Sequence, residues 1–525
     1  MNLSRLFDHW KISENPFRGE EARHDAVFAR VGLAEGPGGP VGGDGGRAAH
    51  SEFEKILGEL TRPATSVVFG EKGSGKTAIR LQIADRVRAH NACTPTERLF
   101  LISYDDLNVF LDQLQGRLLA GGRIKEAHEA FEKIRLVDHM DAILSIGVGR
   151  VVNALLPGHD TPPPADLGDD AVRRARQMDA SLREDLVLLA GVYDRHDVDG
   201  RRTARLRSVL RLPPPRGAAL WFAVVWLGWI PAGALAFWLL AMRPEWFAGL
   251  WLTAGQVVLG VLGAAWLAGV IKVHAFDRLV RRRMAGKVHR QVRVVPRTTE
   301  SLATAMQRID PARRNAGFLP ATGSDEVRYE LLDKMRRIIA HFGFTGTLVV
   351  IDRVDEPTSV NGDPERMRGL IWPLLSSKFL QQERFGMKML LPIELRYALF
   401  KESGQFFQEA RLDKQNLVER LSWTGAMLYD LCTARLAACR SPDAGAMSLL
   451  DLFDEDVTRQ DLVDALDQMH QPRDAFKFLY RCLTEHCSNV TADEGRWRVP
   501  KLVLDAVRKQ ESDRVQQLER GIRPA

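Results

Sequence analysis

Cysteine is scarce in this chain of 525 residues, and the few cysteines show no pairing pattern. The five are Cys93, Cys432, Cys439, Cys482 and Cys487. They form no CxxC pair and no metal-ligand spacing, and an odd number argues against a disulfide framework. We expect reduced thiols in the core of a protein that folds in the cytosol. The N-terminal stretch MNLSRLFDHWKISENPF also lacks the apolar core of a signal peptide.

Charge is sparse in one region only. The stretches 217–242 and 246–271 contain no charged residue, and three residues, Arg-Pro-Glu, connect them. A helix of about 26 residues is roughly 39 Å long, enough to cross the ~30 Å hydrocarbon core of a bilayer with some tilt. Pro231 is tolerated in such a helix, and tryptophans near the ends suit the membrane interface. The sequence therefore predicts a transmembrane hairpin.

Basic residues flank this hairpin on both sides, and the whole chain carries a net charge of +6. Because positive flanks stay on the cytoplasmic side, we expect both ends of the hairpin and both termini in the cytoplasm. Anionic lipid headgroups would attract these arginines, whereas no aromatic interleaving supports nucleic acid as the partner. The flanking residues are Arg201, Arg202, Arg205, Arg207, Arg211 and Arg216 before the hairpin, and Lys272, Arg278, Arg281, Arg282, Arg283, Lys287, Arg290, Arg293 and Arg297 after it.

A glycine-rich loop stands far upstream, in TSVVFGEKGSGKTAIR at residues 65–80. A short apolar strand precedes it and an amphipathic helix follows, which is the context of a phosphate-binding loop. Its glycines let backbone N–H groups point at phosphate oxygens, Lys76 brings a positive charge, and the Thr77 hydroxyl suits Mg²⁺. The predicted nucleotide-binding residues are Gly70, Glu71, Lys72, Gly73, Ser74, Gly75, Lys76 and Thr77. The nearby GPGGPVGGDGG at 36–46 has no lysine and reads as a linker.

An acidic strand end is needed to hold magnesium beside such a loop. The best candidate is TLVVIDRVDEP at 347–357, where four apolar residues predict a buried parallel strand that ends in Asp352. Asp352 would hold Mg²⁺, and either Asp355 or Glu356 would orient the attacking water. Arg353 stands where a glutamate often follows the magnesium aspartate, which makes slow turnover an open alternative.

The pattern of Asp352, Arg353, Val354, Asp355 and Glu356 resembles the Walker B motif of NACHT-type STAND NTPases. A membrane hairpin between the Walker A and Walker B motifs is similar to the related KAP P-loop NTPases. That resemblance implies an ATPase domain anchored to the inner face of the cell inner membrane. The KAP proteins more usually have two adjacent aspartates in Walker B, so this chain departs from their pattern.

Two sensor elements are expected from the same resemblance. GMKMLLPIEL at 386–395 looks like the sensor strand of an additional-strand P-loop domain, with Arg396 as a loose substitute for its polar residue. QPRDAFKFLYRCL from Gln471 resembles the sensor-2 helix start, where Arg473 would reach the γ-phosphate. A surface ion pair is the plainer explanation of Arg473.

The predicted fold is therefore an α/β P-loop NTPase core with a parallel sheet, an inserted two-helix hairpin and a C-terminal helical module. The predicted segments are an N-terminal arm and linker at 1–50, the first part of the core at 51–200, the hairpin with its flanks at 201–300, the second part of the core at 301–414, and a helical lid or winged-helix-like module at 415–525.

We expect a membrane-anchored ATPase that uses Mg-ATP to switch conformation or assembly, as a homo-oligomer or with a protein partner. ATP is expected by elimination, since no NKxD stretch indicates guanine selectivity. The resemblance implies a signalling or defence role. The alternatives are a nucleotide-dependent scaffold that hardly turns ATP over, and an ATPase that acts on nucleic acid. A transporter fits least, because two helices make no pathway.

Overall fold

A computed structural model of the chain describes most of its residues, in two compact units. One unit is Met1–Asn108 together with Gly343–Ala525, and the other is Val109–Phe342. The described residues are 1–18, 21–33, 50–158, 161–197, 199–215, 217–239, 250–315, 317–400, 416–441, 443–491 and 494–519. The predicted linker at 36–46 therefore lies outside them.

A parallel sheet of five described strands forms the centre of the first unit. In spatial order the strands are β2-β3-β4-β1-β5, and every neighbouring pair is parallel. The strands are rich in apolar and β-branched residues and are almost entirely buried, as expected of a sheet covered on both faces. Their bounds are β1 Ser66–Gly70, β2 Arg98–Tyr104, β3 Phe344–Ile351, β4 Phe385–Pro392 and β5 Asn416–Val418.

The register of the sheet brings several strand ends to one edge. Gly70 at the end of β1 lies opposite Pro392 at the end of β4, and Tyr104 at the end of β2 lies opposite Ile351 at the end of β3. Because parallel strands end at the same edge, the loop after β1 and Asp352 after β3 share this edge. β4 lies between β1 and β3.

Helices cover the sheet and complete its core. The glycine-rich loop leads directly into α4, Lys76–Cys93, whose buried residues Ile79, Ile83 and Val87 join one core cluster with the sheet residues Val68, Val350 and Leu390. The short helix α3, Phe53–Leu57, belongs to the same cluster. Other helices of this part are α17 Pro364–Ile371, α18 Ser377–Leu380 and α19 Ile393–Phe400.

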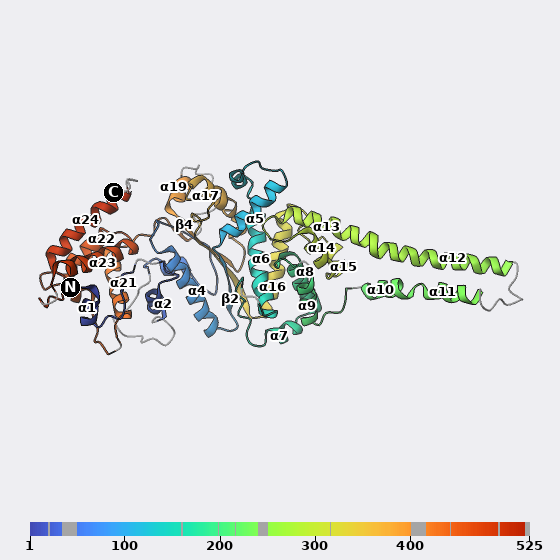
Figure 1. The fold of residues 1–525 in the computed structure, drawn as a ribbon, viewed down its shortest axis with the longest axis horizontal. Coiled ribbons are helices and arrows are strands. Elements are labelled where there is room, and N and C mark those ends of the chain that lie inside the picture. The colour runs from blue at the N-terminus through green and yellow to red at the C-terminus, as the bar shows by residue number, and fades with distance from the viewer. Residues whose placement is uncertain are drawn as a thin grey trace. The chain divides into compact units, whose positions relative to one another are not determined.

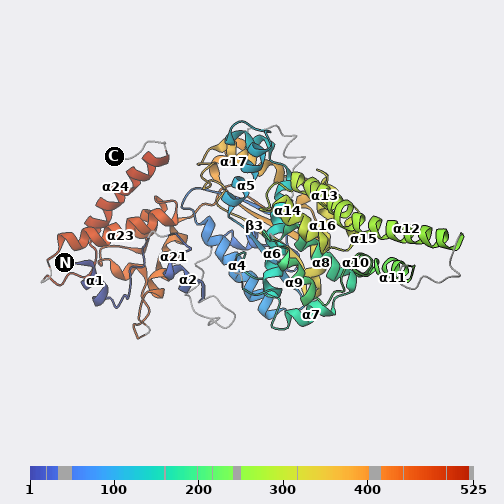
Figure 2. The ribbon, with the colours of Figure 1, turned by 45° about the vertical axis from the view of Figure 1, so that its right-hand side comes forward.

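The N-terminal residues pack into the C-terminal helical module, which the sequence did not predict. This module comprises α21 Gly425–Ala438, α22 Arg459–Asp467, α23 Pro472–Asn489 and α24 Lys501–Glu519. Two N-terminal helices, α1 Leu3–His9 and α2 Ala26–Leu33, contribute Leu6 and Val27 to its core. Figure 2 shows α1 beside α23 and α2 beside α21. Instead of a loose N-terminal arm, the described residues 1–18 and 21–33 pack on this module and contribute Leu6, Ile12, Phe17 and Val27 to its core.

The predicted domain boundaries at 301 and 415 also differ from the structure. β5 at Asn416–Val418 pairs with β1, so the sheet continues past 414. Residues 301–342 belong to the second unit, a helical body in which α6 is buried on most sides against α8 and α16. Its helices include α5 Leu107–Ala120 (which begins at the junction of the units), α6 Leu136–Leu155, α7 Ala171–Gln177, α8 Ala180–Tyr193, α9 Arg201–Val209, α14 Thr299–Gln307, α15 Pro311–Asn315 and α16 Asp325–His341.

The apolar stretches form helices that project from this helical body (Figure 1). The first stretch forms α10, Ala218–Leu227, and α11, Ile230–Phe237, with a break just before Pro231 because proline favours the first turn of a new helix. The second stretch forms α12, Leu250–Ile271. The predicted connection Arg243–Glu245, the flanking Arg216 and the tryptophan at 246 lie outside the described residues.

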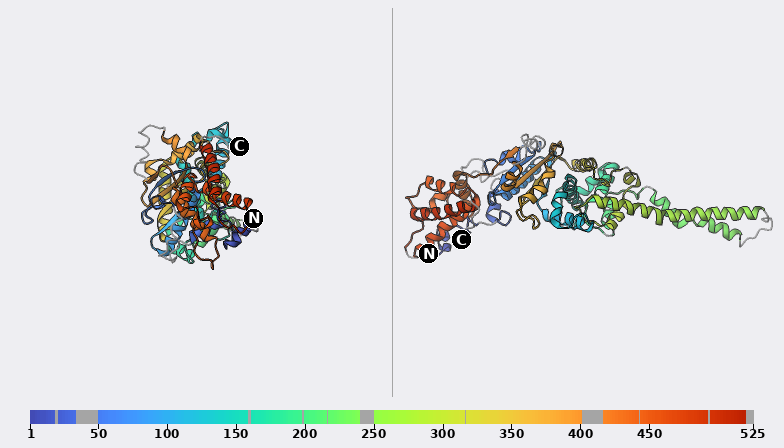
Figure 3. Two further views of the ribbon diagram at one scale, coloured as in Figure 1. Left: turned by 90° about the vertical axis from the view of Figure 1, so that its left-hand side faces the viewer. Right: turned by 90° about the horizontal axis from the view of Figure 1, so that it is seen from above.

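α12 and α10 pack closely along their length. A Cβ at Gly269 would lie 2.9 Å from Val224, and the Trp266 indole donates a hydrogen bond to the Val225 carbonyl at 3.1 Å. The Lys272 ammonium lies 3.4 Å from the centre of the Trp221 ring, which is a cation–π contact at the base of the hairpin. A five-residue π-helical stretch, Lys272–Phe276, then joins α12 to α13, Asp277–Gln291, so the chain continues as one helix (Figure 3).

The outer faces of these helices are apolar and exposed. Leu220, Trp226 and Phe237 are each about two-thirds exposed, and Val257 and Val261 are similar. Among the described residues one helix, Thr253–Gln291, is long and apolar enough to cross a membrane, and only 11% of its most apolar window is buried. A shorter apolar helix covers Ala223–Phe237.

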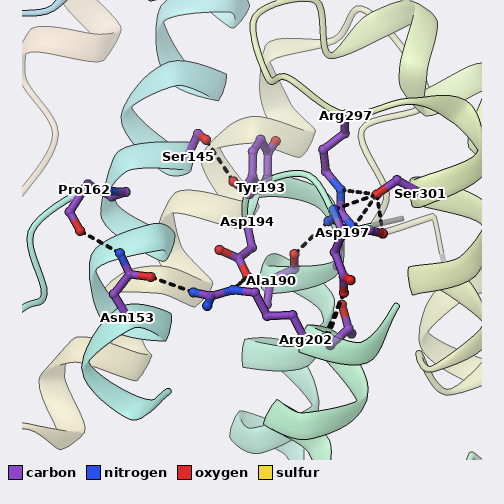
Figure 4. A network of polar contacts seen from close by, with 12 residues as sticks. Ser145, Asn153, Pro162, Ala190, Tyr193, Asp194, Asp197, Arg202, Arg297 and Ser301 are labelled. Atoms are coloured by element: carbon purple, nitrogen blue, oxygen red, sulfur yellow. Dashed lines mark hydrogen bonds and ion pairs between the residues drawn. The ribbon is translucent and has the colours of Figure 1, made fainter. Parts of the chain in front are cut away.

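Several flanking arginines hold the helical body together instead of facing outward, which corrects the prediction that the flanks as a whole face lipid. Arg202 pairs with Asp194 at 2.6 Å and donates to Asn153, and Arg297, 3% exposed, donates to the Ala190 carbonyl at 3.0 Å (Figure 4). Burial lowers the pKa of Arg297 to about 10. The other two such residues are Arg207, paired with Glu184, and Arg293, paired with Asp138.

Candidate functional site

The glycine-rich loop forms a tight turn between β1 and α4. Gly73 and Gly75 adopt φ values of 104° and 96°, the left-handed region that only glycine enters without strain. A Cβ at Gly73 would also lie 2.9 Å from the Gln471 side chain. The sequence pattern GEKGSGKT therefore matches a backbone that requires glycine at these positions.

Lys76 folds back over this loop from the first turn of α4. Its ammonium donates hydrogen bonds to the carbonyls of Gly70 at 2.7 Å and Glu71 at 2.9 Å. Burial lowers the pKa of Lys76, while the nearby carboxylates of Asp355 and Asp352 act in the opposite direction. The Lys76 ammonium is therefore a partly buried cation, and a bound anion such as phosphate would neutralise its charge.

Thr77 and Asp352 meet although 275 positions separate them in the sequence. The Thr77 hydroxyl donates to Asp352 Oδ2 at 3.0 Å, and Asp352 is 1% exposed. Burial raises the pKa of Asp352, and the positive charge of Arg80 acts against that rise. Arg80 lies on α4, with its Nε 3.4 Å from Asp352.

Arg80 connects Asp352 to a second strand end that the sequence analysis missed. Nη1 of Arg80 lies 3.0 Å from the carboxylate of Asp105, the residue that follows β2. Asp105 also pairs with Arg23 of the N-terminal segment at 2.7 Å. No sequence signal identifies Asp105 as a site residue, because that requires knowing that β2 and β3 are neighbours in the sheet. Arg80 could be identified from the sequence, because it lies one helical turn after Lys76 in α4.

The two candidate water-orienting residues have different surroundings. Glu356 forms an ion pair with Arg353, which also lies 3.6 Å from Glu21. Arg353 adopts a φ of 64°, so the chain turns sharply directly after Asp352. Asp355 has no ion pair among the described residues, and its charge is the leading one that raises the pKa of Lys76. Both acids line the cavity described below, and of the two Glu356 is the one engaged by an arginine.

Of the predicted sensor residues, Arg473 lies at this site and Arg396 does not. Arg473 stands in the first turn of α23, with its Cβ 3.2 Å from the position of a Cβ on Gly73. Gln471, at the start of the same helix, donates to the Glu71 carboxylate. Arg396 instead pairs with Glu419 at 2.6 Å and is not among the cavity's lining residues.

One cavity of about 340 Å³ lies at this site, and its lining includes Lys76, Thr77, Asp352, Asp355, Glu356 and Arg473. Polar residues from the loop and from the turn after β3 form one part of its wall, and aromatic and aliphatic side chains form another. Trp423 donates from its indole to the Ser74 carbonyl at 2.8 Å, and His50 meets its ring edge to face at 4.8 Å. The apolar lining comprises Phe28, Ile79, Trp423, Leu431, Pro472 and Phe476. The volume and mixed lining suit a ligand that has a charged part and a flat apolar part.

Arg435 of α21 is a further basic residue of the cavity that the sequence analysis missed. It is 2% exposed and lies 2.7 Å from Asp25, and its Nε donates to the Pro16 carbonyl at 2.8 Å. Its Nη2 has no hydrogen-bond partner among the described residues. A signal for it exists, because helical spacing puts Arg435 on the same face as the buried Leu428, Leu431 and Cys432.

The donor set suits Mg²⁺ bound together with phosphate. No group of three or more His, Cys, Asp or Glu side chains that could hold a metal occurs in the described part of the chain. Mg²⁺ is commonly held by one or two protein oxygens with phosphate and water completing its shell. Thr77 and Asp352 supply two such oxygens at 3.0 Å from each other.

A comparison of the chain with protein-family models, curated proteins and solved structures finds no match.

Proposed function

We propose that this chain is a membrane-anchored P-loop ATPase of the KAP or STAND kind, which binds Mg-ATP beside residues 70–77. The observation that carries the proposal is the contact between Thr77 and Asp352. The two residue types expected to share a magnesium ion are 275 positions apart in the sequence, and the folding of a parallel sheet brings them to one edge.

The strand order supports the additional-strand type of P-loop core. β4 lies between the strand that leads to the glycine-rich loop and the strand that ends in Asp352. The loop amides and Lys76 would bind the β- and γ-phosphates, and Arg473 and Arg435 line the same cavity as further cations. Bound Mg²⁺ would offset the phosphate charge. Asp355 would orient the attacking water.

A slow or non-hydrolysing nucleotide switch is the second candidate, because two specific contacts favour it. Arg353 pairs with Glu356, and Arg80 shares Asp352 with Thr77. Both contacts hold acidic groups in place with arginines, so the acids must be released before they take part in hydrolysis.

The apolar helices α10, α11 and α12 would anchor the chain by crossing the inner membrane twice. Their exposed faces are apolar, and these three helices contain no lysine or arginine. Exposed arginines on α13, such as Arg282 and Arg283, would meet anionic headgroups at the cytoplasmic side.

The enzymatic proposal is tested by Mg²⁺-dependent ATP hydrolysis by the detergent-purified full-length chain. We expect turnover that Lys76→Ala abolishes and that Lys55→Ala, at an exposed lysine of α3, leaves unchanged. Equal turnover by the Lys76→Ala and wild-type proteins would refute the proposed site. Nucleotide binding by the wild-type protein without hydrolysis would favour the second candidate, the non-hydrolysing switch.

The anchoring proposal is tested by labelling intact cells with thiol reagents. A cysteine introduced at Glu245 should react with a membrane-impermeant reagent from outside. The natural Cys93, which is exposed on the first unit, should react only after the cells are opened. Labelling of both cysteines on the same side would contradict a two-span hairpin.

A further inference from the structure

A second cavity, of about 460 Å³, lies in the C-terminal helical module. Its wall comes from the end of α1, from α23 and from the segment that leads into α24. This volume is in the range of small-molecule sites. The lining residues that carry the argument are His9, Trp10, Asp454, His486, Arg496 and Arg498, together with Trp497.

One wall of this cavity is aromatic and fixed in place. The His9 ring stacks on Trp497 with centroids 4.3 Å apart and planes 6° apart, and it meets Trp10 edge to face at 5.2 Å. The Trp10 indole donates to the Trp497 carbonyl at 2.9 Å. His9 itself is exposed. A flat ring entering the cavity can therefore extend an existing stack without losing energy to reordering.

A buried histidine supports the same wall. His486 is 1% exposed, and its Nε2 lies 3.1 Å from the Arg496 carbonyl. A carbonyl only accepts hydrogen bonds, so Nε2 carries the proton and Nδ1 carries a lone pair. Nδ1 has no hydrogen-bond partner among the described residues. Burial lowers the pKa of His486. Nδ1 is itself almost fully shielded, so His486 holds the Arg496 carbonyl in place and leaves the ligand contacts to the exposed groups of the cavity.

Charged groups stand at the rim. Asp454 is exposed and supplies an acceptor. Arg496 and Arg498 are exposed, and their ion pairs with Glu494 and Glu455 are long, at 3.8 Å and 3.6 Å. Exposed pairs of this length contribute little, so both guanidinium groups remain available to an anion.

We propose that this cavity binds a nucleotide unit, whose base stacks on the aromatic wall and donates an N–H group to Asp454 while its phosphate meets Arg496 and Arg498. An aromatic stack, an acceptor and cations at one place match the three chemical parts of a nucleotide. This site lies outside the phosphate-loop cavity, and the proposal does not depend on ATP hydrolysis there.

The test is calorimetric titration of the full-length Lys76→Ala protein, so that the phosphate loop does not contribute. The probes are AMP, CMP, GMP and UMP, a mixed-sequence single-stranded octanucleotide, and ribose 5-phosphate. We expect saturable binding of at least one mononucleotide or of the octanucleotide, and no binding of ribose 5-phosphate, which lacks a base. Binding of a mononucleotide as tight as that of the octanucleotide identifies a free nucleotide. Tighter, salt-sensitive binding of the octanucleotide identifies a nucleic-acid strand.

Variants of exposed residues keep the test independent of folding. His9→Ala and Arg498→Glu should each weaken binding at least tenfold. Arg459→Glu, at an exposed arginine of the same module outside the cavity, should leave binding unchanged. Absence of saturable binding, equal binding of ribose 5-phosphate, or affinities unaffected by the two cavity variants would each overturn the proposal.

Discussion

Arg435 and Asp25 form a buried ion pair, 2.7 Å apart, in the wall of the phosphate-loop cavity. The acid comes from the N-terminal segment and the arginine from the C-terminal module, so two segments far apart in the sequence meet at the proposed nucleotide site. The Asp25 carboxylate lies in the wall of the cavity that a polyanionic ligand would enter. It pairs with the Arg435 guanidinium and so competes with the phosphates of such a ligand for the same N–H donors.

The first prediction concerns this pair. Asp25→Asn removes a negative charge and leaves Arg435 available, so we expect ATP affinity to rise by about five- to tenfold, or ~1 kcal/mol. Arg435→Met should lower the affinity instead, and should destabilise the fold by about 3 kcal/mol because the buried Asp25 carboxylate loses its ion-pair partner. Equilibrium nucleotide binding and thermal unfolding measure both effects. Changes of the same sign in the two variants would contradict this role for Asp25.

The second prediction separates the two acids after β3. Asp355→Asn should lower the turnover number about 100-fold, as expected for a group that positions the attacking water. Glu356→Gln should have less than about a tenfold effect, because Arg353 already engages that carboxylate. The measurement is steady-state ATP hydrolysis at saturating Mg-ATP. A larger loss in Glu356→Gln would reverse the assignment.

The third prediction concerns Lys388, which lies fully buried in β4 with its ammonium 3.0 Å from the Ser66 hydroxyl. Burial lowers its pKa to about 7, against ~10.4 for an exposed lysine. The unfolded chain therefore binds a proton between about pH 10 and pH 7 that the folded chain does not, so stability falls as the pH drops through this range and is constant below it. Lys388→Met should stabilise the protein at pH 7 by on the order of 4 kcal/mol.

Thermal unfolding at pH 7 and pH 9.5 checks this sign. The melting temperature of Lys388→Met should exceed that of the wild type by less at the higher pH. Lys55→Met, at an exposed lysine, should show no such dependence. A pH-independent difference would show that shape alone, and not charge, distinguishes the two proteins.

The fourth prediction separates structural from lipid-facing arginines. Arg297→Met removes the donor to the Ala190 and Gly191 carbonyls and should lower the free energy of unfolding by about 3 kcal/mol without changing lipid binding. Arg282→Ala, at an exposed position on α13, should leave unfolding unchanged and weaken binding to anionic vesicles. Thermal unfolding measures the effect on stability, and vesicle flotation measures the effect on lipid binding. Equal effects of both variants on flotation would contradict the division.

Local signals in the sequence predicted the local parts of the site. The glycine spacing around Lys76 and the apolar run before Asp352 predicted a strand, loop and helix and a buried strand, because steric and hydrophobic preferences act within a few residues. The contacts of Arg80 with Asp105 and of Arg435 with Asp25 depend on which strand and which helix become neighbours. Charge or periodicity along the chain does not contain that information.

The flanks of the hairpin show the same limit. From the sequence, the arginines before and after the apolar stretches are all predicted to face lipid headgroups, since composition does not distinguish an exposed arginine from a buried one. Arg297 is buried because carbonyls of α8, 107 positions earlier at Ala190, lie beside it, and Arg202 is partly buried between Asp194 and Asn153. Residues 1–50 are predicted as an arm and linker, whereas Leu6 and Val27 find their core among the C-terminal helices, a long-range contact that no local pattern reveals.

The most direct test of the central claim is the Mg²⁺ dependence of ATP affinity, measured by calorimetry on the full-length wild-type, Asp352→Asn and Asp363→Asn proteins. Asp363 caps α17 and lies outside the cavity. If Thr77 and Asp352 hold one ion with the phosphates, Mg²⁺ will tighten ATP binding to the wild-type and Asp363→Asn proteins at least tenfold and will have little effect on Asp352→Asn. An unchanged Mg²⁺ effect in Asp352→Asn, or no binding of ATP by the wild-type protein, would contradict the account.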